Sequence, residues 1–430
     1  MKREPLLDKS ARVGVLGLGY VGLPLAAEFC RKGFRVTGFE VSRARVASLL
    51  KGDSYVPDVP SSDLKRFLKA GLFKAEHSFE GLSEQDVIIV CVQTPLRKSK
   101  EPDVRNIVSA IREISKRLRR GQLIVLESTT YPGTTDEIVL PLLEESGLRL
   151  GRDFYLAFSP ERVDPGNPRY GIANTPKIVG GADEESTRLA SRLYSRVVGQ
   201  VVPVSSTRAA ELAKLLENSF RSVNIALVNE MAQICRRLGL DVWEVIAAAA
   251  TKPFGFMPFY PGPGIGGHCI PKDPKLLSWK MKRMNFRPKF IELATRINDS
   301  MPGYAVERIA EILRSSGKPL KGARILILGV AYKPDVPDYR ESPTLDVIQL
   351  LLAAGARVRY HDPFVPAFEL GGRRLASVEL TARELTRADC AAILTAHRGV
   401  DYGEVVRLSR RVFDARNATR GLAAPNLYRL

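Results

Sequence analysis

The sequence predicts an α/β protein in which two Rossmann-like, doubly wound parallel-sheet domains are joined by a central helical domain with a long helix. Three observations support this prediction. A strand, glycine turn, helix and strand pattern opens the chain, a related pattern recurs near its C-terminal end, and a helical apolar repeat of about thirty residues lies between them. At 430 residues the chain is too long for one hydrophobic core. We place the domain boundaries at 1–205, 206–315 and 316–430.

The first pattern, over residues 11–40, has the form of a dinucleotide-binding fingerprint. Its turn has the spacing G-x-G-x-x-G, follows an apolar strand and opens a helix. Glu40 ends the next strand, about twenty positions further on. A carboxylate there would accept hydrogen bonds from ribose hydroxyls and repel a 2′-phosphate, so we expect NAD rather than NADP. The turn residues are Gly17, Gly19, Tyr20, Val21 and Gly22.

Further strands alternate with helices at 86–95, 122–129 and 154–162. Each ends in small polar residues, and the carboxyl ends of parallel strands line the ligand crevice of such a sheet. Ordinary loop chemistry, with Ser and Thr capping helices, is an equally open interpretation. The strand-end residues are Thr94, Ser128, Thr129 and Glu161.

From Ser206 the pattern becomes helical and continues through Leu240, with Ser206 or Thr207 as the cap. Lys214 and Asn218 are four residues apart and therefore project from one face. A helical lysine is usually a solvated charge, but the apolar residues around Lys214 favour a functional position. A helix of this length also suits a linker and a dimer surface.

The run PGPGIGGHCIPKDP contains Cys269 and is the most informative segment for chemistry. Its prolines and glycines exclude helix and strand between 261 and 271, so we expect a shaped loop whose backbone can approach a ligand closely. A thiol in such a loop, followed by Lys272 and Asp273, is a candidate nucleophile. The alternative is a buried, inert cysteine.

The second α/β unit begins near residue 323 and retains only Gly329 of the glycine fingerprint, so we expect it to bind a different nucleotide. Tyr332, Lys333 and Arg340 flank its turn, and cations there suit phosphates. The last strand, RVFDARN, carries Arg416.

Composition narrows the class of protein. The net charge of +18 allows nucleic-acid binding, but the basic runs have helical spacing and no nucleic-acid motif accompanies them. We therefore expect no nucleic-acid partner. The five cysteines and four histidines show no metal-ligand spacing, so no metal is expected. The chain has no membrane-length apolar run, and the polar start MKREPLLDKS has no signal-peptide core. We expect a cytoplasmic protein.

The glycine turn, the helix with Lys214 and Asn218, and GGHCIPKDP closely resemble, in that order, the nucleotide-sugar 6-dehydrogenases, the UDP-glucose and UDP-N-acetylhexosamine dehydrogenase family. The similarity extends from about residue 11 to Arg416, and the cysteine motif and KPD-x₄-RESP are its specific parts. The resemblance implies oxidation of a sugar C6 alcohol to a carboxylate by two NAD⁺ in turn. A thiolate suits this chemistry because it converts the intermediate aldehyde to a thiohemiacetal and then to a thioester.

The resemblance also implies site residues. Cys269 would be the nucleophile, Lys214 and Asn218 would stabilise oxyanions, and Asp273 would act with water in proton transfer. Glu161 would assist thioester hydrolysis, and Thr129 would position water and cofactor. The implied NAD-binding residues are Gly17, Gly19, Tyr20, Val21, Gly22, Glu40, Arg45, Thr94, Ser128, Thr129 and Arg340. The implied substrate-binding residues are Glu161, Arg162, Lys214, Asn218, Tyr260, Gly264, Gly266, Tyr332, Lys333 and Arg416.

Differences from the UDP-glucose enzymes narrow the choice of expected substrate. His268 stands where those enzymes typically have serine, Pro165 stands where they often have a second glutamate, and TKPFGFMPFYPGPG resembles the N-acetylglucosamine branch. UDP-N-acetylglucosamine is therefore the expected substrate, with UDP-glucose or UDP-N-acetylmannosamine as alternatives. Lys252 lies near the position of a substrate arginine that a dimer mate contributes in the family. A homodimer or higher homo-oligomer is expected.

Two other functions are also compatible with the residues alone. A two-electron hydroxyacid or 6-phosphogluconate-type dehydrogenase also joins a Rossmann domain to helices, but it would not need Cys269. A non-enzymatic NAD- or nucleic-acid-binding protein would show salt-dependent affinity and no NAD reduction.

Overall fold

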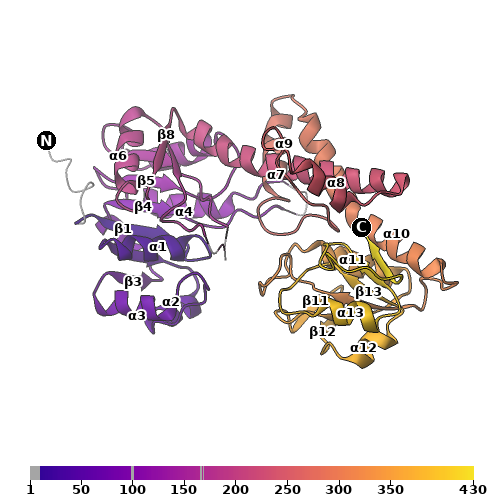
Figure 1. The fold of residues 1–430 in the computed structure, drawn as a ribbon. Helices are drawn as coiled ribbons and strands as arrows, with labels where there is room; N and C mark the ends of the chain where they lie inside the picture. The colour runs from indigo at the N-terminus through magenta and orange to yellow at the C-terminus, as the bar shows by residue number, and fades with distance from the viewer. Residues whose placement is uncertain (1–9, 98–100, 165–166, 168) are drawn as a thin grey trace. The chain divides into compact units, whose positions relative to one another are not determined.

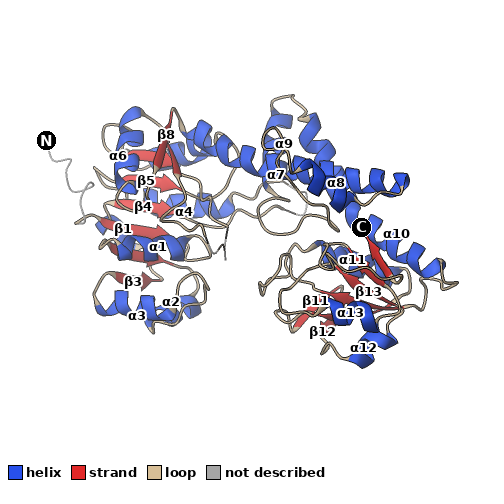
Figure 2. Cartoon of the chain, in the orientation of Figure 1, coloured by secondary structure: helices blue, strands red, loops and turns tan. Residues whose placement is uncertain are grey.

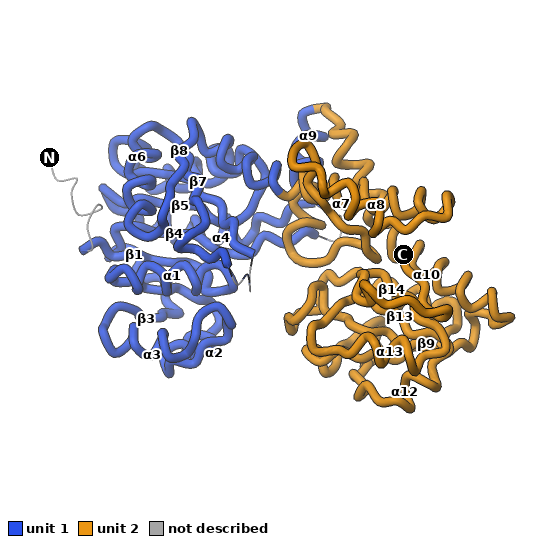
Figure 3. Tube along the Cα trace, in the orientation of Figure 1, with its two compact units in different colours: residues 1–217, 275–284 blue, residues 218–274, 285–430 orange. Residues whose placement is uncertain are grey.

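The computed structural model describes residues 10–97, 101–164, 167 and 169–430. It divides the chain into two compact units, Met1–Glu217 with Lys275–Met284 (unit 1) and Asn218–Pro274 with Asn285–Leu430 (unit 2), which Figure 3 colours separately. The three domain boundaries expected above stay a prediction. The N-terminal stretch before residue 10 and Pro165, both used in the sequence interpretation, lie outside the described residues.

Unit 1 is built on an eight-stranded sheet with the order β3-β2-β1-β4-β5-β6-β7-β8 (Figure 1). The strands are β1 (Arg12–Leu16), β2 (Arg35–Phe39), β3 (Phe73–Glu76), β4 (Val87–Val90), β5 (Leu123–Leu126), β6 (Tyr155–Phe158), β7 (Lys177–Gly181) and β8 (Val201–Val204). The expected strands are confirmed in β1, β2, β4, β5 and β6, whereas β3 was not predicted. The sheet is not wholly parallel, however, because β7 runs antiparallel to β6. The alternation of strands and helices that predicts parallel strands ends at β6, since the described residues between β6 and β7 form no helix.

Both faces of this sheet are buried. Val13 and Val15 of β1 belong to one hydrophobic cluster, whereas Leu16 belongs to a second cluster together with Ile88 and Val90 of β4. Such two-sided burial is typical of a doubly wound sheet. The flanking helices are α1 (Gly22–Arg31), α2 (Arg43–Leu50), α3 (Ser61–Lys69), α4 (Arg105–Ser115), α5 (Leu140–Glu144) and α6 (Glu184–Tyr194), with short turns η2 (Glu80–Glu84) and η3 (Thr135–Val139).

The helical middle of the chain contains α7 (Thr207–Leu238), α8 (Val242–Ala249), α9 (Asp273–Arg283) and α10 (Lys289–Arg314). The long helix expected from Ser206 is confirmed in α7, and the Ser206 hydroxyl accepts the N–H of Ala209 at 3.2 Å. The segment 261–271 contains no helix or strand, as its prolines and glycines predict. None of the helices within the described residues is long and apolar enough to cross a membrane.

The C-terminal part of unit 2 contains a five-stranded parallel sheet with the order β10-β9-β13-β14-β15 and a separate hairpin (Figure 2). Its strands are β9 (Arg324–Leu328), β10 (Arg357–His361), β13 (Cys390–Ile393), β14 (Val412–Asp414) and β15 (Leu427–Arg429), and the hairpin is β11 (Ala367–Leu370) with β12 (Arg373–Ala376). The helices are α11 (Pro343–Ala353), α12 (Ala382–Arg387) and α13 (Tyr402–Leu408).

Two expectations about the chain end were wrong. The strand RVFDARN is not the last one, because β15 pairs with β14 beyond it. Arg416 also lies two residues after β14 rather than within a strand. Its backbone N–H instead donates to the carboxylate of Asp414 at 2.9 Å, which turns the chain out of the sheet and leaves Arg416 in a loop.

Candidate functional site

The glycine turn of unit 1 has the geometry that a pyrophosphate site requires. Gly17 has a positive φ of 87°, and a Cβ on Gly22 would lie 1.9 Å from the carbonyl oxygen of Gly17. These two glycines therefore serve the tight turn and close packing. A Cβ on Gly19 would meet no atom within 4 Å, so this residue faces open space at the start of α1. Such an opening at a helix N-terminus fits a phosphate group. Tyr20 beside it is half exposed.

Glu40 directly follows β2 and lies beside this turn. Its carboxylate accepts the N–H of Leu18 at 3.3 Å and the N–H of Ser42 at 3.1 Å. The guanidinium of Arg45 lies 3.6 Å from it and packs over the ring of Tyr55. Glu40 and Arg45 thus lie together, which fits the expectation that both residues bind NAD.

The loops that follow β4 and β5 are tied together by hydroxyl groups. Ser128 donates to the carbonyl of Val92 at 2.7 Å, and Thr94 donates to the carbonyl of Thr129. The three predicted strand-end residues therefore lie side by side at the carboxyl edge of the sheet. This placement agrees with a role in lining the crevice.

Glu161 follows β6 and is nearly buried. Its carboxylate accepts the N–H groups of Arg162 at 2.6 Å and Val163 at 2.7 Å, and the ammonium of Lys177 lies 3.4 Å away. Burial alone would raise the pKa of Glu161, but Lys177, the two N–H groups and Lys214 together hold it below its ordinary value. Glu161 is therefore ionised at neutral pH. Its electrostatic coupling to Lys214 also shows that these two predicted residues are close within unit 1.

Lys177 was not predicted from the sequence. It is 4% exposed and also contacts Glu127 at 2.9 Å, while the hydroxyl of Tyr194 donates to the other oxygen of Glu127. The sequence offered only a weak indication of this ion pair, because each partner is a charged residue next to an apolar run. Glu127 follows LIVL, and Lys177 precedes IVGG. Arg162, a predicted substrate residue, pairs with Glu217 at 2.7 Å and donates to the carbonyl of Pro176.

The cysteine loop leads directly into α9. Cys269 is exposed, whereas the other four cysteines are buried. The carbonyl of Cys269 accepts the N–H groups of Lys272 at 3.0 Å and Asp273 at 2.8 Å, which forms a turn. Asp273, fully buried, accepts a hydrogen bond of 2.6 Å from the amide of Asn218. Lys214 and Asn218 of α7 are 8% and 5% exposed, so both predicted residues are buried rather than solvated.

The glycines of this loop pack against the protein itself. A Cβ on Gly266 would lie 2.9 Å from atoms of Tyr332 and Pro343, and one on Gly264 would lie 2.8 Å from Pro343. Gly267 has a φ of 93°, and a Cβ there would lie 3.0 Å from the ring of Tyr332. These glycines therefore let the loop approach Tyr332 and the KPD-x₄-RESP segment closely. The expected close approach to a ligand stays a prediction.

His268 and Arg340 meet at one carboxylate. The imidazole Nε2 of His268 lies 3.0 Å from Oδ2 of Asp338, and Arg340 donates to both oxygens at 2.9 and 2.7 Å. Burial would raise the pKa of Asp338, but Arg340 and His268 hold it at about 2. Asp338 therefore links the residue that precedes Cys269 to the predicted cofactor residue Arg340. The sequence offered no signal for this contact, since 70 positions separate its partners.

A pocket of about 450 Å³ in unit 2 gathers four of the residues predicted to bind the substrate nucleotide, but Gly264 and Gly266 do not line it. Tyr260, Tyr332, Lys333 and Arg416 all line it, together with Trp243, which stacks on Tyr260 at an interplanar angle of 18°. Loss of water around the guanidinium lowers the pKa of Arg416 to about 10, so it remains a cation at neutral pH. Aromatic rings beside cations fit a nucleobase and a diphosphate.

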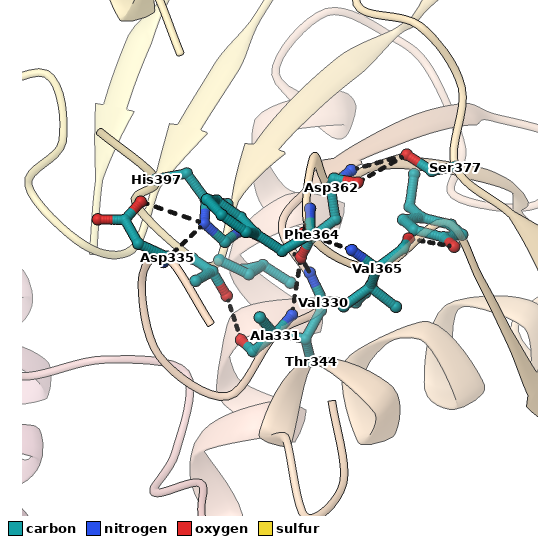
Figure 4. Close-up of polar contacts among 12 residues, drawn as sticks. Val330, Ala331, Asp335, Thr344, Asp362, Phe364, Val365, Ser377 and His397 are labelled. Carbon is teal, nitrogen blue, oxygen red and sulfur yellow. Dashed lines mark hydrogen bonds and ion pairs between the residues drawn. The ribbon is translucent and has the colours of Figure 1, made fainter. Parts of the chain in front are cut away.

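A buried network fixes the loop that carries Tyr332 and Lys333 (Figure 4). Asp362 directly follows β10, just as Glu40 directly follows β2. The Oδ2 of Asp362, however, accepts the N–H groups of Val330 at 2.8 Å and Ala331 at 2.9 Å. The Nε2 of His397 lies 3.1 Å from the same oxygen, and its Nδ1 accepts the N–H of Asp335 at 3.0 Å. The second α/β unit thus uses its acidic strand-end residue to hold its own loop.

Comparison with known proteins agrees with this arrangement. Family models of the UDP-glucose/GDP-mannose dehydrogenase family match three successive stretches, the NAD binding domain at residues 11–198, the central domain at 208–300 and the UDP binding domain at 326–421. A UDP-N-acetyl-D-glucosamine 6-dehydrogenase from Pseudomonas aeruginosa is 38% identical over 361 residues, 84% of each chain. A UDP-N-acetyl-D-mannosamine dehydrogenase from Pyrococcus horikoshii is 38% identical, over 82% of this chain and 84% of its own.

Solved structures show the same fold. A UDP-D-ManNAc dehydrogenase from Pyrococcus horikoshii superposes with a TM-score of 0.89 at 34% identity, covering 97% of this chain and 98% of the other. A UDP-glucose dehydrogenase from Pyrobaculum islandicum gives a TM-score of 0.84 at 29% identity, with 97% of each chain covered. The matched domains, the glycine turn with Glu40 and the nucleotide pocket agree with one another: this chain belongs to the UDP-glucose/GDP-mannose dehydrogenase family, an oxidoreductase family whose nucleotide-sugar 6-dehydrogenases use NAD.

Proposed function

We propose that this chain is a UDP-N-acetyl-D-glucosamine 6-dehydrogenase that oxidises the C6 hydroxyl to a carboxylate in two successive two-electron steps. The observation that carries the proposal is the exposed Cys269 in a turn anchored by the buried Asp273, which Asn218 holds at 2.6 Å. A two-electron dehydrogenase has no use for such a thiol. Bound NAD would supply the hydride acceptor, and the open backbone at Gly19 with Glu40 at the strand end fits it.

The reaction balances as follows. In the first step the C6 alcohol loses a proton and a hydride, which leaves an aldehyde. The thiolate of Cys269 adds to the aldehyde carbon, and the resulting thiohemiacetal loses a second hydride to give a thioester. Water then attacks the thioester carbonyl, the C–S bond breaks, and the carboxylate leaves as the thiolate is restored. Two hydrides are therefore transferred for each sugar oxidised.

The remaining side chains suit these steps. Lys214 is a buried cation on α7 and would stabilise the oxyanions that develop at C6, with help from Asn218. Asp273 would move protons through a bound water. Glu161, ionised beside Lys177, would accept the proton of the hydrolytic water, and Thr129 would position water and cofactor.

The substrate choice rests on sequence and on relatives. His268 precedes the thiol, as in the N-acetylhexosamine branch of the resemblance, and relatives named for N-acetylglucosamine and N-acetylmannosamine are both 38% identical to this chain. The pocket with Trp243, Tyr260 and Arg416 would hold UDP in either case. UDP-N-acetylmannosamine is therefore the second candidate, and UDP-glucose is the third.

A homodimer is part of the proposal. Several large apolar side chains of the helical middle are exposed to solvent, and exposed apolar surface often marks a protein–protein interface. They include Leu227, Leu238, Leu240, Phe254, Met257 and Phe290. Lys252, which packs 4.9 Å over the ring of Phe254, lies beside this surface. Sedimentation of the full chain tests the dimer.

The test of the function is a panel of UDP sugars incubated with NAD⁺, with the acid product identified by mass spectrometry. UDP-N-acetylglucosamine should give the highest kcat/KM, and the Cys269→Ala variant should form no acid. Cys235→Ala, at a buried cysteine, is the matched control. Acid formation by the Cys269→Ala variant at the wild-type rate would refute the thioester route.

A further inference from the structure

Lys177 occupies an unusual position for a lysine, because it is buried at the edge of β7 between two carboxylates. Its ammonium lies 2.9 Å from Glu127 and 3.4 Å from Glu161, and its side chain is 5% exposed. The ring of Tyr194 lies 5.3 Å from the nitrogen. Burying a lone charge costs several kcal/mol, so three charges persist here only because they satisfy one another.

The pKa values of the two carboxylates are shifted in opposite directions. Glu127 is fully buried, and this burial raises its pKa even though Lys177 and the Tyr194 hydroxyl oppose the effect. Glu161 receives two backbone N–H groups besides Lys177, and these contacts lower its pKa. The pKa of Lys177 is raised, since the attraction of both carboxylates outweighs its burial. The cation is therefore permanent, and it favours the ionised form of Glu161.

The surroundings of Glu161 explain why it needs that cation. Cys91 at the end of β4 is buried and its pKa is raised well above its ordinary value, so it contributes no charge near neutral pH. Lys214 also helps to lower the pKa of Glu161, but the proposed function gives Lys214 a different task. Lys177, whose ammonium lies 3.4 Å from the Glu161 carboxylate, is thus the cation that holds Glu161 throughout the reaction.

We propose that Lys177 is a positioning residue for thioester hydrolysis, which keeps the Glu161 carboxylate ionised and aimed at the hydrolytic water. This inference rests on the proposed function. In the step concerned, a water oxygen attacks the thioester carbon while its proton passes to a Glu161 oxygen, and the C–S bond breaks as the electron pair returns to the sulfur of Cys269. Lys177 itself exchanges no proton and touches no substrate.

A purely structural role for Lys177, as the counterion of Glu127, predicts a different outcome. In that case its removal would lower stability and leave the hydrolysis step and its pH dependence unchanged. The double variant Lys177→Met with Glu127→Gln separates the two roles, because it removes both charges of the buried Lys177–Glu127 pair and leaves no lone carboxylate at position 127. Lys177→Arg retains the cation, and Lys116→Met, whose lysine pairs with Glu113 at 2.6 Å on the surface, is the matched control.

The experiment follows a single turnover of the full enzyme with UDP-N-acetylglucosamine and NAD⁺ between pH 5 and 9. For the double variant we expect a burst of two NADH per active site, a tenfold or greater slowing of the following steady state, and an acyl adduct on Cys269 in the intact mass. The acidic limb of the pH profile of kcat should move to a pH about one to three units higher, because the pKa of Glu161 rises when Lys177 is removed. Lys177→Arg should restore most of the rate.

Wild-type turnover with an unshifted acidic limb in a folded double variant would overturn the proposal. A slowed first hydride transfer with no acyl adduct would overturn it too, because the defect would precede hydrolysis. Failure of the proposed function is recognised separately. If Cys269→Ala still forms acid, or if the wild-type enzyme transfers only one hydride per sugar, the thioester route itself is wrong.

Discussion

The amide nitrogen of Asn218 donates a hydrogen bond of 2.6 Å to Oδ2 of Asp273, and both residues are buried. This bond joins the middle of α7 to the first residue of α9, four positions after Cys269. The N–H of Asp273 also donates to the carbonyl of Cys269 at 2.8 Å. Two successive hydrogen bonds therefore connect the backbone of Cys269 to α7 through Asp273.

Removing the charge of Asp273 should slow catalysis more than it weakens binding. We expect Asp273→Asn to lower kcat by about two orders of magnitude, since general acid–base groups contribute that much, with KM for the UDP sugar nearly unchanged. Steady-state kinetics measures both. Asn218→Asp should also fail, because it places a second carboxylate at hydrogen-bond distance from that of Asp273. Asn224→Asp, on the exposed side of α7, is the control. An active Asp273→Asn enzyme would remove this residue from the mechanism.

Glu211 makes stability depend on pH. It accepts the N–H groups of Gly133 at 2.6 Å and Thr135 at 2.9 Å, and burial raises its pKa to about 7. The folded chain thus keeps a proton that the unfolded chain, with a carboxyl pKa of about 4.3, releases. The free energy of unfolding should therefore fall by about 2–3 kcal/mol as the pH rises from about 4.5 to 7.

The variant Glu211→Gln should remove that slope, which urea unfolding at several pH values measures. Glu144→Gln, at a partly exposed carboxylate that pairs with Arg149, should retain the wild-type slope. A Glu211→Gln variant whose stability still falls in this window would assign the pH dependence to other groups.

Gly267 should not tolerate a side chain. Its φ of 93° is strained for other residues, and a Cβ would lie 3.0 Å from the ring of Tyr332. We expect Gly267→Ala to cost about 1–3 kcal/mol, visible as a lower Tm, and to displace the neighbouring Cys269 enough to reduce kcat. Gly239→Ala, which also has a positive φ but meets no atom within 4 Å, controls for backbone strain alone. Equal effects at both positions would exclude the contact with Tyr332.

His397 should influence UDP binding without contacting the nucleotide. Its imidazole holds Asp335 and Asp362, which fix the loop that carries Lys333. We expect His397→Leu to weaken UDP binding about tenfold in calorimetry, because a loop that must be ordered on binding lowers affinity, while NAD affinity stays unchanged. Arg398→Ala removes an exposed partner of the same Asp335 and should have little effect. Undiminished UDP affinity in His397→Leu would show that the loop keeps its shape without the imidazole.

Local patterns predicted much of the fold. The alternation of apolar residues and the glycine spacing placed β1, α1 and β2, and the three- and four-residue apolar repeat placed α7, because neighbouring residues determine these elements. The antiparallel β7 and the short β15 were not predicted, since partner strands rather than local sequence select them. Arg416 was expected in a strand, and a backbone turn at Asp414 instead leaves it in a loop.

The site was predictable only where a motif marks it. The residues of GGHCIPKDP and the pocket residues Tyr332 and Lys333 were named in advance because proline, glycine and aromatic residues are conspicuous in a sequence. Lys177 and Asp338 were not, since a single lysine or aspartate resembles a surface charge until tertiary contacts bury it. Those contacts join residues 50 and 70 positions apart, beyond the reach of any local pattern.

The most direct measurement counts NADH formed per molecule of UDP-N-acetylglucosamine consumed by the purified chain in excess NAD⁺. Transfer of two hydrides through a thioester on Cys269 predicts a ratio of two, with the uronic acid as the product at every time point. A ratio of one, with an aldehyde as the product, would contradict the account.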